Sequence, residues 1–185
     1  IKNNPIKEFT SAGLIVNEKI YNLDVVIMAT GFDAMTGALL NMDIRGRNNL
    51  SLKHKWKNGP RTFLGLTTEM FPNMFMVSGP GSPSVLTNMI VSIEQHVDWI
   101  FDCIQYLKAN KFNTIEPSLK DENSWVEHNK SVANDHVRSS CNSWYLGANI
   151  EGKPKVFMPY VGGFPEYVKK CNEISKNNYK GFILK

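Results

Sequence analysis

The sequence predicts an α/β fold built from short strands, a long amphipathic helix and glycine-rich loops. Three observations predict it. An apolar run at residues 25–28 stops at the small-residue turn Thr30-Gly31, apolar residues recur at helical spacing after Asn88, and residues 140–165 are dense in glycine, proline and aromatic residues. With 185 residues, 42% hydrophobic and 21% charged, the chain can bury a core of ordinary size.

Residues 13–32 are predicted to form a hairpin that leads into a buried strand. Residues 14–16 pair with Ile20 and Tyr21 across a polar turn, and four apolar residues at 25–28 then suit burial on both faces. Thr30-Gly31 would let a ligand approach the backbone where that strand ends, and strand ends of open α/β sheets bind nucleotides. The alternative is a buried strand followed by a plain surface turn.

Residues 33–84 are predicted to hold loops and short strands that could line a ligand or a partner. Residues 74–77 are expected to form a second buried strand, and it too ends in small residues, at 78–84. Residues 140–165 favour ordered contact with a flat ligand, with plain surface packing as the alternative.

Residues 85–185 are predicted to be mainly helical. The first helix begins after Asn88, and its apolar face is expected to enter the core. Ser118 with Asp121 forms a capping pattern for a second helix, and Pro165 suits the first turn of a third. Residues 182–184 add an edge strand or pack on that helix. The seven apolar positions of the first helix are Ile90, Ile93, Val97, Ile100, Phe101, Ile104 and Leu107.

Composition excludes several classes of function. The net charge of +4 comes from basic residues interleaved with acidic ones, which argues against nucleic-acid binding. No apolar run approaches 18 residues and no signal-peptide pattern is present, so we expect no membrane span and a cytoplasmic protein. Three cysteines without metal-ligand spacing are expected to be reduced packing residues, and the pair His128 and His136 does not predict a metal site. The cysteines are Cys103, Cys141 and Cys171.

Seven separated motifs occur in one order along the chain, and together they resemble the type I Baeyer-Villiger monooxygenases, closest to the phenylacetone and cyclic-ketone branch. They are Ala29-Thr30-Gly31-Phe32-Asp33, Gly59-Pro60-Arg61-Thr62, Phe71-Pro72-Asn73-Met74-Phe75, Gly79-Pro80-Gly81-Ser82-Pro83-Ser84, Ser92-Ile93-Glu94-Gln95-His96-Val97, Ser143-Trp144-Tyr145-Leu146-Gly147-Ala148-Asn149 and Gly162-Gly163-Phe164.

The resemblance implies the C-terminal portion of a flavoprotein with two dinucleotide-binding domains, in which this chain completes the FAD domain. Residues 1–32 would be the end of the NADPH-domain linker and the last FAD-domain strands. The family uses FAD, NADPH and O2 to convert a ketone into an ester or lactone. The chain lacks a glycine-rich phosphate motif and the family's catalytic arginine, and it begins without methionine. We therefore expect a piece of a longer polypeptide that is inactive alone.

The resemblance also implies site residues, none of them catalytic. Those expected to bind cofactor are Thr30, Gly31, Asp33, Asn88, Met89 and Trp144. The substrate pocket would be lined by Ser84, Val85, Leu86 and Met89. Trp144 would contact the nicotinamide cofactor from a mobile loop, and the helix after Asn88 would point its positive end at the flavin.

The expected partners are a small ketone, O2, and the flavin- and NADPH-binding portion that the chain lacks, supplied in cis or in trans. The isolated chain could also self-associate. Two alternatives stay open: a non-catalytic truncated module that docks onto a partner, and a fragment of a related flavin N-hydroxylating monooxygenase, which shares the Ala-Thr-Gly-Phe strand end.

Overall fold

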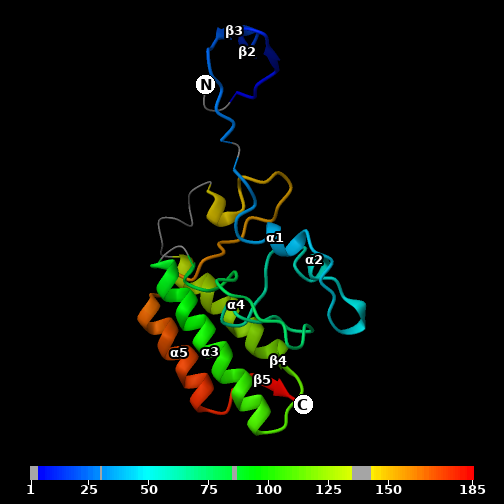
Figure 1. Ribbon diagram of the computed structural model, residues 1–185, viewed down its shortest axis with the longest axis vertical. Coiled ribbons are helices and arrows are strands. Elements are labelled where there is room, and N and C mark those ends of the chain that lie inside the picture. Colours follow the sequence, from blue (N-terminus) through cyan, green and yellow to red (C-terminus); the bar gives the residue numbers. More distant parts are fainter. Residues whose placement is uncertain (1–3, 30, 85–86, 135–142) are drawn as a thin grey trace. The chain divides into compact units, whose positions relative to one another are not determined.

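A computed structural model describes residues 4–29, 31–84, 87–134 and 143–185, and the chain divides into two compact units, residues 1–32 and 33–185. The first unit holds a three-stranded antiparallel sheet in the order β1-β2-β3, formed by Glu8–Thr10, Gly13–Val16 and Lys19–Asn22 (Figure 1). The mixed α/β class predicted from the sequence is confirmed, since the described residues form both short strands and helices.

The predicted hairpin is present as β2 and β3, with Val16 opposite Lys19 in the register. Asn17 and Glu18 form its two-residue turn, and both have left-handed backbone angles, with φ of 49° and 59°. Such a turn matches the right-handed twist of the flanking strands. Strand β1, which extends the hairpin to a three-stranded sheet, was not predicted.

Two predicted buried strands are wrong. Residues 24–29 are not a strand in this structure, and their apolar side chains are exposed, with Val25 at 75% and Ile27 at 85%. A strand buried on both faces needs neighbours on each side, and the described residues pair none with it. Residues 74–77 are also irregular, although Met76 is buried and its N–H bonds the Leu66 carbonyl at 2.8 Å.

The second unit is built around three long helices, α3 (Met89–Ala109), α4 (Leu119–Asn134) and α5 (Phe164–Lys176), with α3 packed on α5 (Figure 1). Strands β4 (Ile115–Pro117) and β5 (Phe182–Leu184) pair antiparallel. Of the two alternatives stated for residues 182–184, the strand is therefore present, and its partner β4 was not predicted. Among its described residues the unit also has short helices at α1 (Gly37–Leu40), η1 (Arg47–Asn49), α2 (Leu52–Lys55) and η4 (Trp144–Leu146).

The predicted helix starts are confirmed by their caps. The Asn88 side chain accepts a hydrogen bond from the Ile90 N–H at 3.0 Å, and Ser118 Oγ accepts one from the Asp121 N–H at 3.1 Å. Pro165 lies in the first turn of α5. Polar side chains at these positions satisfy backbone donors that have no partner within a helix.

The buried face of α3 agrees with the predicted one only in part: Leu107 is buried and Ile100 packs against the core, as predicted, but other predicted positions are exposed. Ile90 and Phe101 are 65% and 57% exposed, and Val97 and Ile104 are exposed beside them. The face that enters the core consists of Ser92, His96, Trp99, Cys103 and Leu107. Hydrophobicity alone did not identify this face, because His96 and Trp99 are buried there with specific hydrogen-bond partners.

A buried irregular segment, residues 61–84, lies against the helices. Its backbone is bonded by their side chains: Tyr167 donates to the Leu64 carbonyl at 2.7 Å, and Trp125 Nε1 donates to the Gly81 carbonyl at 3.0 Å. Leu64 and Thr68 are fully buried. Because a buried loop must satisfy its peptide groups, these bonds fix its path where regular structure does not.

His96 links α3 to both the buried segment and α5. Its Nδ1 accepts a hydrogen bond from the Ser78 N–H at 3.0 Å, so its proton lies on Nε2, which faces the Tyr167 hydroxyl oxygen at 3.0 Å. Burial lowers the pKa of His96 from 6.5 to about 4. The ring is therefore neutral at physiological pH.

The stability of the chain should fall as the pH drops from about 6.5 towards 4. The unfolded chain takes up a proton on His96 in that range while the folded chain resists it, a difference of about 3 kcal/mol for a pKa lowered from 6.5 to about 4. Urea denaturation at pH 7.5 and pH 4.5 measures the loss. His96→Asn, which keeps an acceptor for the Ser78 N–H, should be less stable at pH 7.5 but lose less on acidification. An equal acid-induced loss in both proteins would contradict this assignment.

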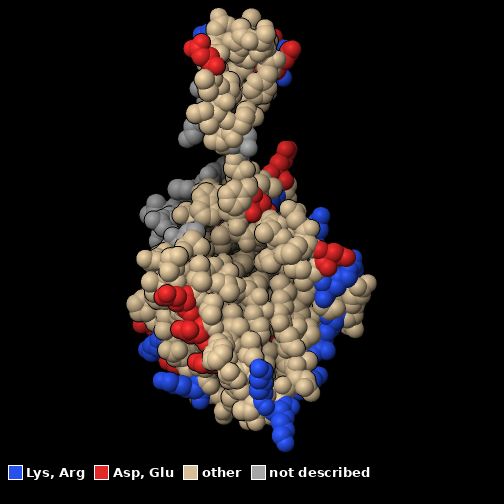
Figure 2. All heavy atoms as spheres, viewed as in Figure 1, with Lys and Arg blue, Asp and Glu red and all other residues tan. Residues whose placement is uncertain are grey.

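The buried cysteines are packing groups, as predicted. Cys103 and Cys171 are free thiols within the core, and burial raises the pKa of each thiol to about 12. Cys141 and His136 lie outside the described residues. Among the described helices, none has both the length and the apolar character needed to cross a membrane. On the face in Figure 2, uncharged residues cover most of the surface, and acidic and basic side chains lie mainly towards its edges.

Candidate functional site

The predicted site residues fall into three groups in the structure. Thr30, Val85 and Leu86 lie outside the described residues. Gly31 belongs to the first unit, has a φ of +72°, and has open space where a Cβ would be. The remaining predicted residues lie in the second unit.

Residues 33–36 connect to the loop that carries Trp144. Asp33 forms an ion pair with Lys153, and Lys153 Nζ also donates to Thr36 Oγ1 at 2.7 Å. The Thr36 hydroxyl donates in turn to Asp33 Oδ1 at 3.2 Å. Neither Lys153 nor Thr36 was predicted as a site residue, because a single lysine in a glycine- and aromatic-rich loop carries no motif.

Ser84 of the predicted substrate pocket contacts the same segment. Its side chain is 2% exposed, and its Oγ lies 3.8 Å from Met35 Sδ, within reach of a weak hydrogen bond. Ser84 has a φ of +47°, a left-handed conformation that is uncommon for a residue with a side chain. Residues 33–36 thus contact a predicted pocket residue through Met35 and the Trp144 loop through Asp33 and Thr36.

Asn88 and Met89 stand at the N-terminus of α3. The Asn88 side chain already caps the helix, which leaves Met89, 39% exposed, as the first helical residue. The part that these two residues play in cofactor binding stays a prediction.

The Trp144 loop is closed by its own hydrogen bonds. Trp144 packs on Tyr145 with ring centroids 4.2 Å apart, and backbone bonds from Val156 to Leu146 (3.2 Å) and from Met158 to Tyr145 (2.9 Å) join its two arms. Among the described residues, Ser143 Oγ is buried without a hydrogen-bond partner. These contacts order residues 143–158, and the contact with a flat ligand expected for residues 140–165 stays a prediction.

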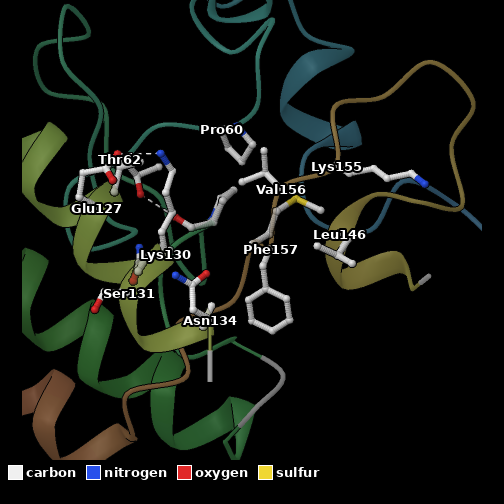
Figure 3. A pocket seen from close by; sticks show the side chains of 16 residues that line it. Pro60, Thr62, Glu127, Lys130, Ser131, Asn134, Leu146, Lys155, Val156 and Phe157 are labelled. Carbon is white, nitrogen blue, oxygen red and sulfur yellow. Dashed lines mark hydrogen bonds and ion pairs between the residues drawn. The ribbon is translucent and has the colours of Figure 1, made fainter. Parts of the chain in front are cut away.

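A cavity of about 570 Å³ that the sequence did not predict lies between α4 and residues 146–158 (Figure 3). Figure 3 shows Phe157 and Asn134 facing each other across it, with the Lys155 side chain directed away. Glu127 and Lys130 on its α4 wall form an ion pair at 2.7 Å. One wall of the cavity is apolar, and the wall on α4 carries amide groups and this ion pair. The two charges of the pair offset each other.

Known proteins with related sequences are monooxygenases. The chain is 40% identical to acetone monooxygenase (methyl acetate-forming) of Gordonia sp., 42% to cyclohexanone 1,2-monooxygenase of Acinetobacter sp. and 37% to phenazine N-monooxygenase of Lysobacter antibioticus. Each match covers all of this chain and 34–35% of the relative. No family model matches the chain.

Solved structures of monooxygenases show the same similarity. A closed crystal structure of cyclohexanone monooxygenase superposes with a TM-score of 0.93 at 39% identity, and OTEMO in complex with FAD and NADP gives 0.91 at 37%; each match covers all of this chain and 34% of the other. The chain is a homologue of the Baeyer-Villiger monooxygenases. It spans about one third of the length of the curated relatives it matches, and the resemblance predicted from its motifs is confirmed.

Two glycines of the Trp144 loop provide a matched test of its packing. Gly147 and Gly152 have nearly equal φ values of +72° and +73°, but a Cβ on Gly147 would lie 2.9 Å from Lys153 Cδ, whereas one on Gly152 would meet nothing. Gly152→Ala should cost about 1 kcal/mol of unfolding free energy for the left-handed backbone alone.

Gly147→Ala should cost measurably more, because it also displaces the Lys153 side chain from Asp33. Urea denaturation of both variants gives the comparison. Equal losses would show that the packing of Lys153 against Gly147 contributes nothing.

Proposed function

We propose that this chain is part of an FAD- and NADPH-dependent monooxygenase that inserts one oxygen atom of O2 into a ketone, giving an ester or lactone. One observation supports it beyond homology. Asp33, expected on the flavin side, lies in the segment that contacts both Ser84 of the expected substrate pocket and the loop of Trp144. The flavin, when bound, supplies the oxidation chemistry, and this chain positions the groups around it.

The described residues fit a nicotinamide cofactor at the Trp144 loop. The buried Ser143 hydroxyl beside Trp144 has no partner among the described residues, and a polar cofactor group could satisfy it. Trp144 offers a flat ring and an indole N–H donor. Thr30, Gly31, Asp33, Asn88 and Met89 are proposed to contact the cofactors, and Ser84, Val85, Leu86 and Met89 to line the ketone pocket.

We infer that the activity requires a further flavin- and nicotinamide-binding portion, in cis or in trans. The α3 stripe Ile90, Val97, Phe101 and Ile104 is exposed, as are residues 25–28 of the other unit. Such apolar surfaces normally meet another protein surface. The relatives are about three times as long as this chain, and the portion that it lacks is the occupant proposed for these surfaces.

Two alternative functions are each supported by a specific observation. The same exposed apolar stripe would serve a non-catalytic module that docks onto a partner. The 37% identity to a phenazine N-monooxygenase, nearly that of the ketone-oxidising relatives, supports oxidation of a ring nitrogen instead of a ketone. Both are tested by the same activity assay.

The native polypeptide that carries this sequence should consume NADPH and O2 when a ketone is added, and release an ester or lactone detected by mass spectrometry. The 185-residue chain alone should show no ketone-dependent NADPH oxidation. Product from phenazine but from no ketone would favour N-oxidation. A native polypeptide that turns over neither, and contains no flavin, would support the docking module.

Replacement of Trp144 should weaken NADPH binding by the native polypeptide. Trp144→Ala removes both the ring and the indole donor, and we expect a Kd raised by about 10- to 100-fold, equivalent to roughly 1.4 to 2.8 kcal/mol. Trp144→Phe keeps an aromatic ring without the donor and should show a smaller increase. Fluorescence titration with NADPH measures both. An unchanged Kd in Trp144→Ala would contradict the cofactor role of this residue.

A further inference from the structure

The contact between Lys153 and Asp33 is sheltered from water at both ends. The Lys153 side chain is 11% exposed and that of Asp33 is 23% exposed. Thr36, 2% exposed, contacts both side chains: its hydroxyl oxygen accepts from the Lys153 ammonium, and its hydrogen points to the Asp33 carboxylate. Charge-assisted hydrogen bonds in such a setting are stronger than those at an open surface.

Each partner is anchored in its own segment. The Asp33 carbonyl accepts from the Gly37 N–H at 3.1 Å, which joins Asp33 to the start of α1. On the other side, the Lys153 N–H bonds the Ile150 carbonyl at 3.3 Å, and Gly147 packs along the lysine stem. Movement of the Trp144 loop away from α1 would therefore have to break the ion pair and expose the lysine stem.

We propose that Lys153 is a positioning residue: its ion pair with Asp33 and Thr36 holds the Trp144 loop in place, and so sets how well Trp144 can bind the nicotinamide cofactor. The second half of this inference rests on the proposed function of the loop. Loss of Lys153 or Asp33 leaves the other charged group sheltered from water without its counterion. This weakens the attachment of the Trp144 loop to residues 33–36.

Hydrogen exchange of the chain tests the ion pair without any cofactor. The reporters are the amides of Gly147, Val156 and Met158, which form the loop's own hydrogen bonds. Lys153→Met should raise their exchange rates by about tenfold, and Asp33→Asn should act similarly. The double variant should exchange no faster than the faster single variant, since both remove one interaction.

Two controls make this experiment specific. Lys153→Arg keeps the charge and should restore slow exchange, and Lys169→Met, at an exposed position of α5, should leave the loop unchanged. Loop exchange unaffected by Lys153→Met, or additive effects in the double variant, would overturn the proposal. Faster exchange that extends to the Cys103 amide within α3 would overturn it too, because Lys153 would then support the whole unit.

The Kd of NADPH for the native polypeptide, measured in the same variants, tests the second half. We expect about a tenfold weaker binding in Lys153→Met with recovery in Lys153→Arg. If the loop amides exchange faster but the Kd of NADPH does not change, the role of the ion pair in holding the loop is supported. The role of the loop in cofactor binding is then contradicted. The two failures are therefore distinguishable.

Discussion

The need to satisfy buried peptide groups shapes this chain. Residues 61–83 form no strand or helix of three or more residues, and several of their buried N–H and carbonyl groups are bonded by side chains from the helices. His96, Trp125 and Tyr167 provide these partners from α3, α4 and α5. Each of the three is buried and also forms a hydrogen bond with the backbone of this segment.

That buried segment ends at Ser84, and this position gives the candidate site its geometry. The core fixes the segment, Ser84 contacts Met35, and residues 33–36 receive Lys153 from the Trp144 loop. The path from the core to the loop thus passes through short polar contacts and not through a continuous sheet. A site assembled in this way depends on a few side chains, and single substitutions at Lys153 or Asp33 should affect it more than the fold.

Local signals in the sequence predicted the elements that depend on local chemistry. A polar turn at residues 17–19 predicted the hairpin, and Asn88 and Ser118 predicted the helix starts, because caps and turns are satisfied by neighbouring residues. The strand expected at residues 24–28 failed because an apolar run becomes a buried strand only when other strands flank it. The motifs of the candidate site predicted the family, but the site residues themselves stay predictions.

Features that depend on tertiary partners could not be predicted from spacing. The buried side of α3 follows the hydrogen bonds of His96 and Trp99, which link residues 18 and 72 positions apart. Lys153 and Asp33 are 120 residues apart, and a single lysine has no pattern to mark it. The exposed stripe of α3 explains why hydrophobicity misled: Ile90, Val97, Phe101 and Ile104 are apolar but do not enter the core.

The mass of the native polypeptide in its source cells tests this interpretation most directly, using an antibody against the chain and an intact-mass readout. Because the chain covers 34–35% of its relatives, a monooxygenase of the usual length would have about three times the 21.0 kDa of this chain. We predict such a species, or a 21.0 kDa chain that copurifies with a flavoprotein. A native chain of 21.0 kDa without flavin or a flavin-binding companion would contradict the proposed function.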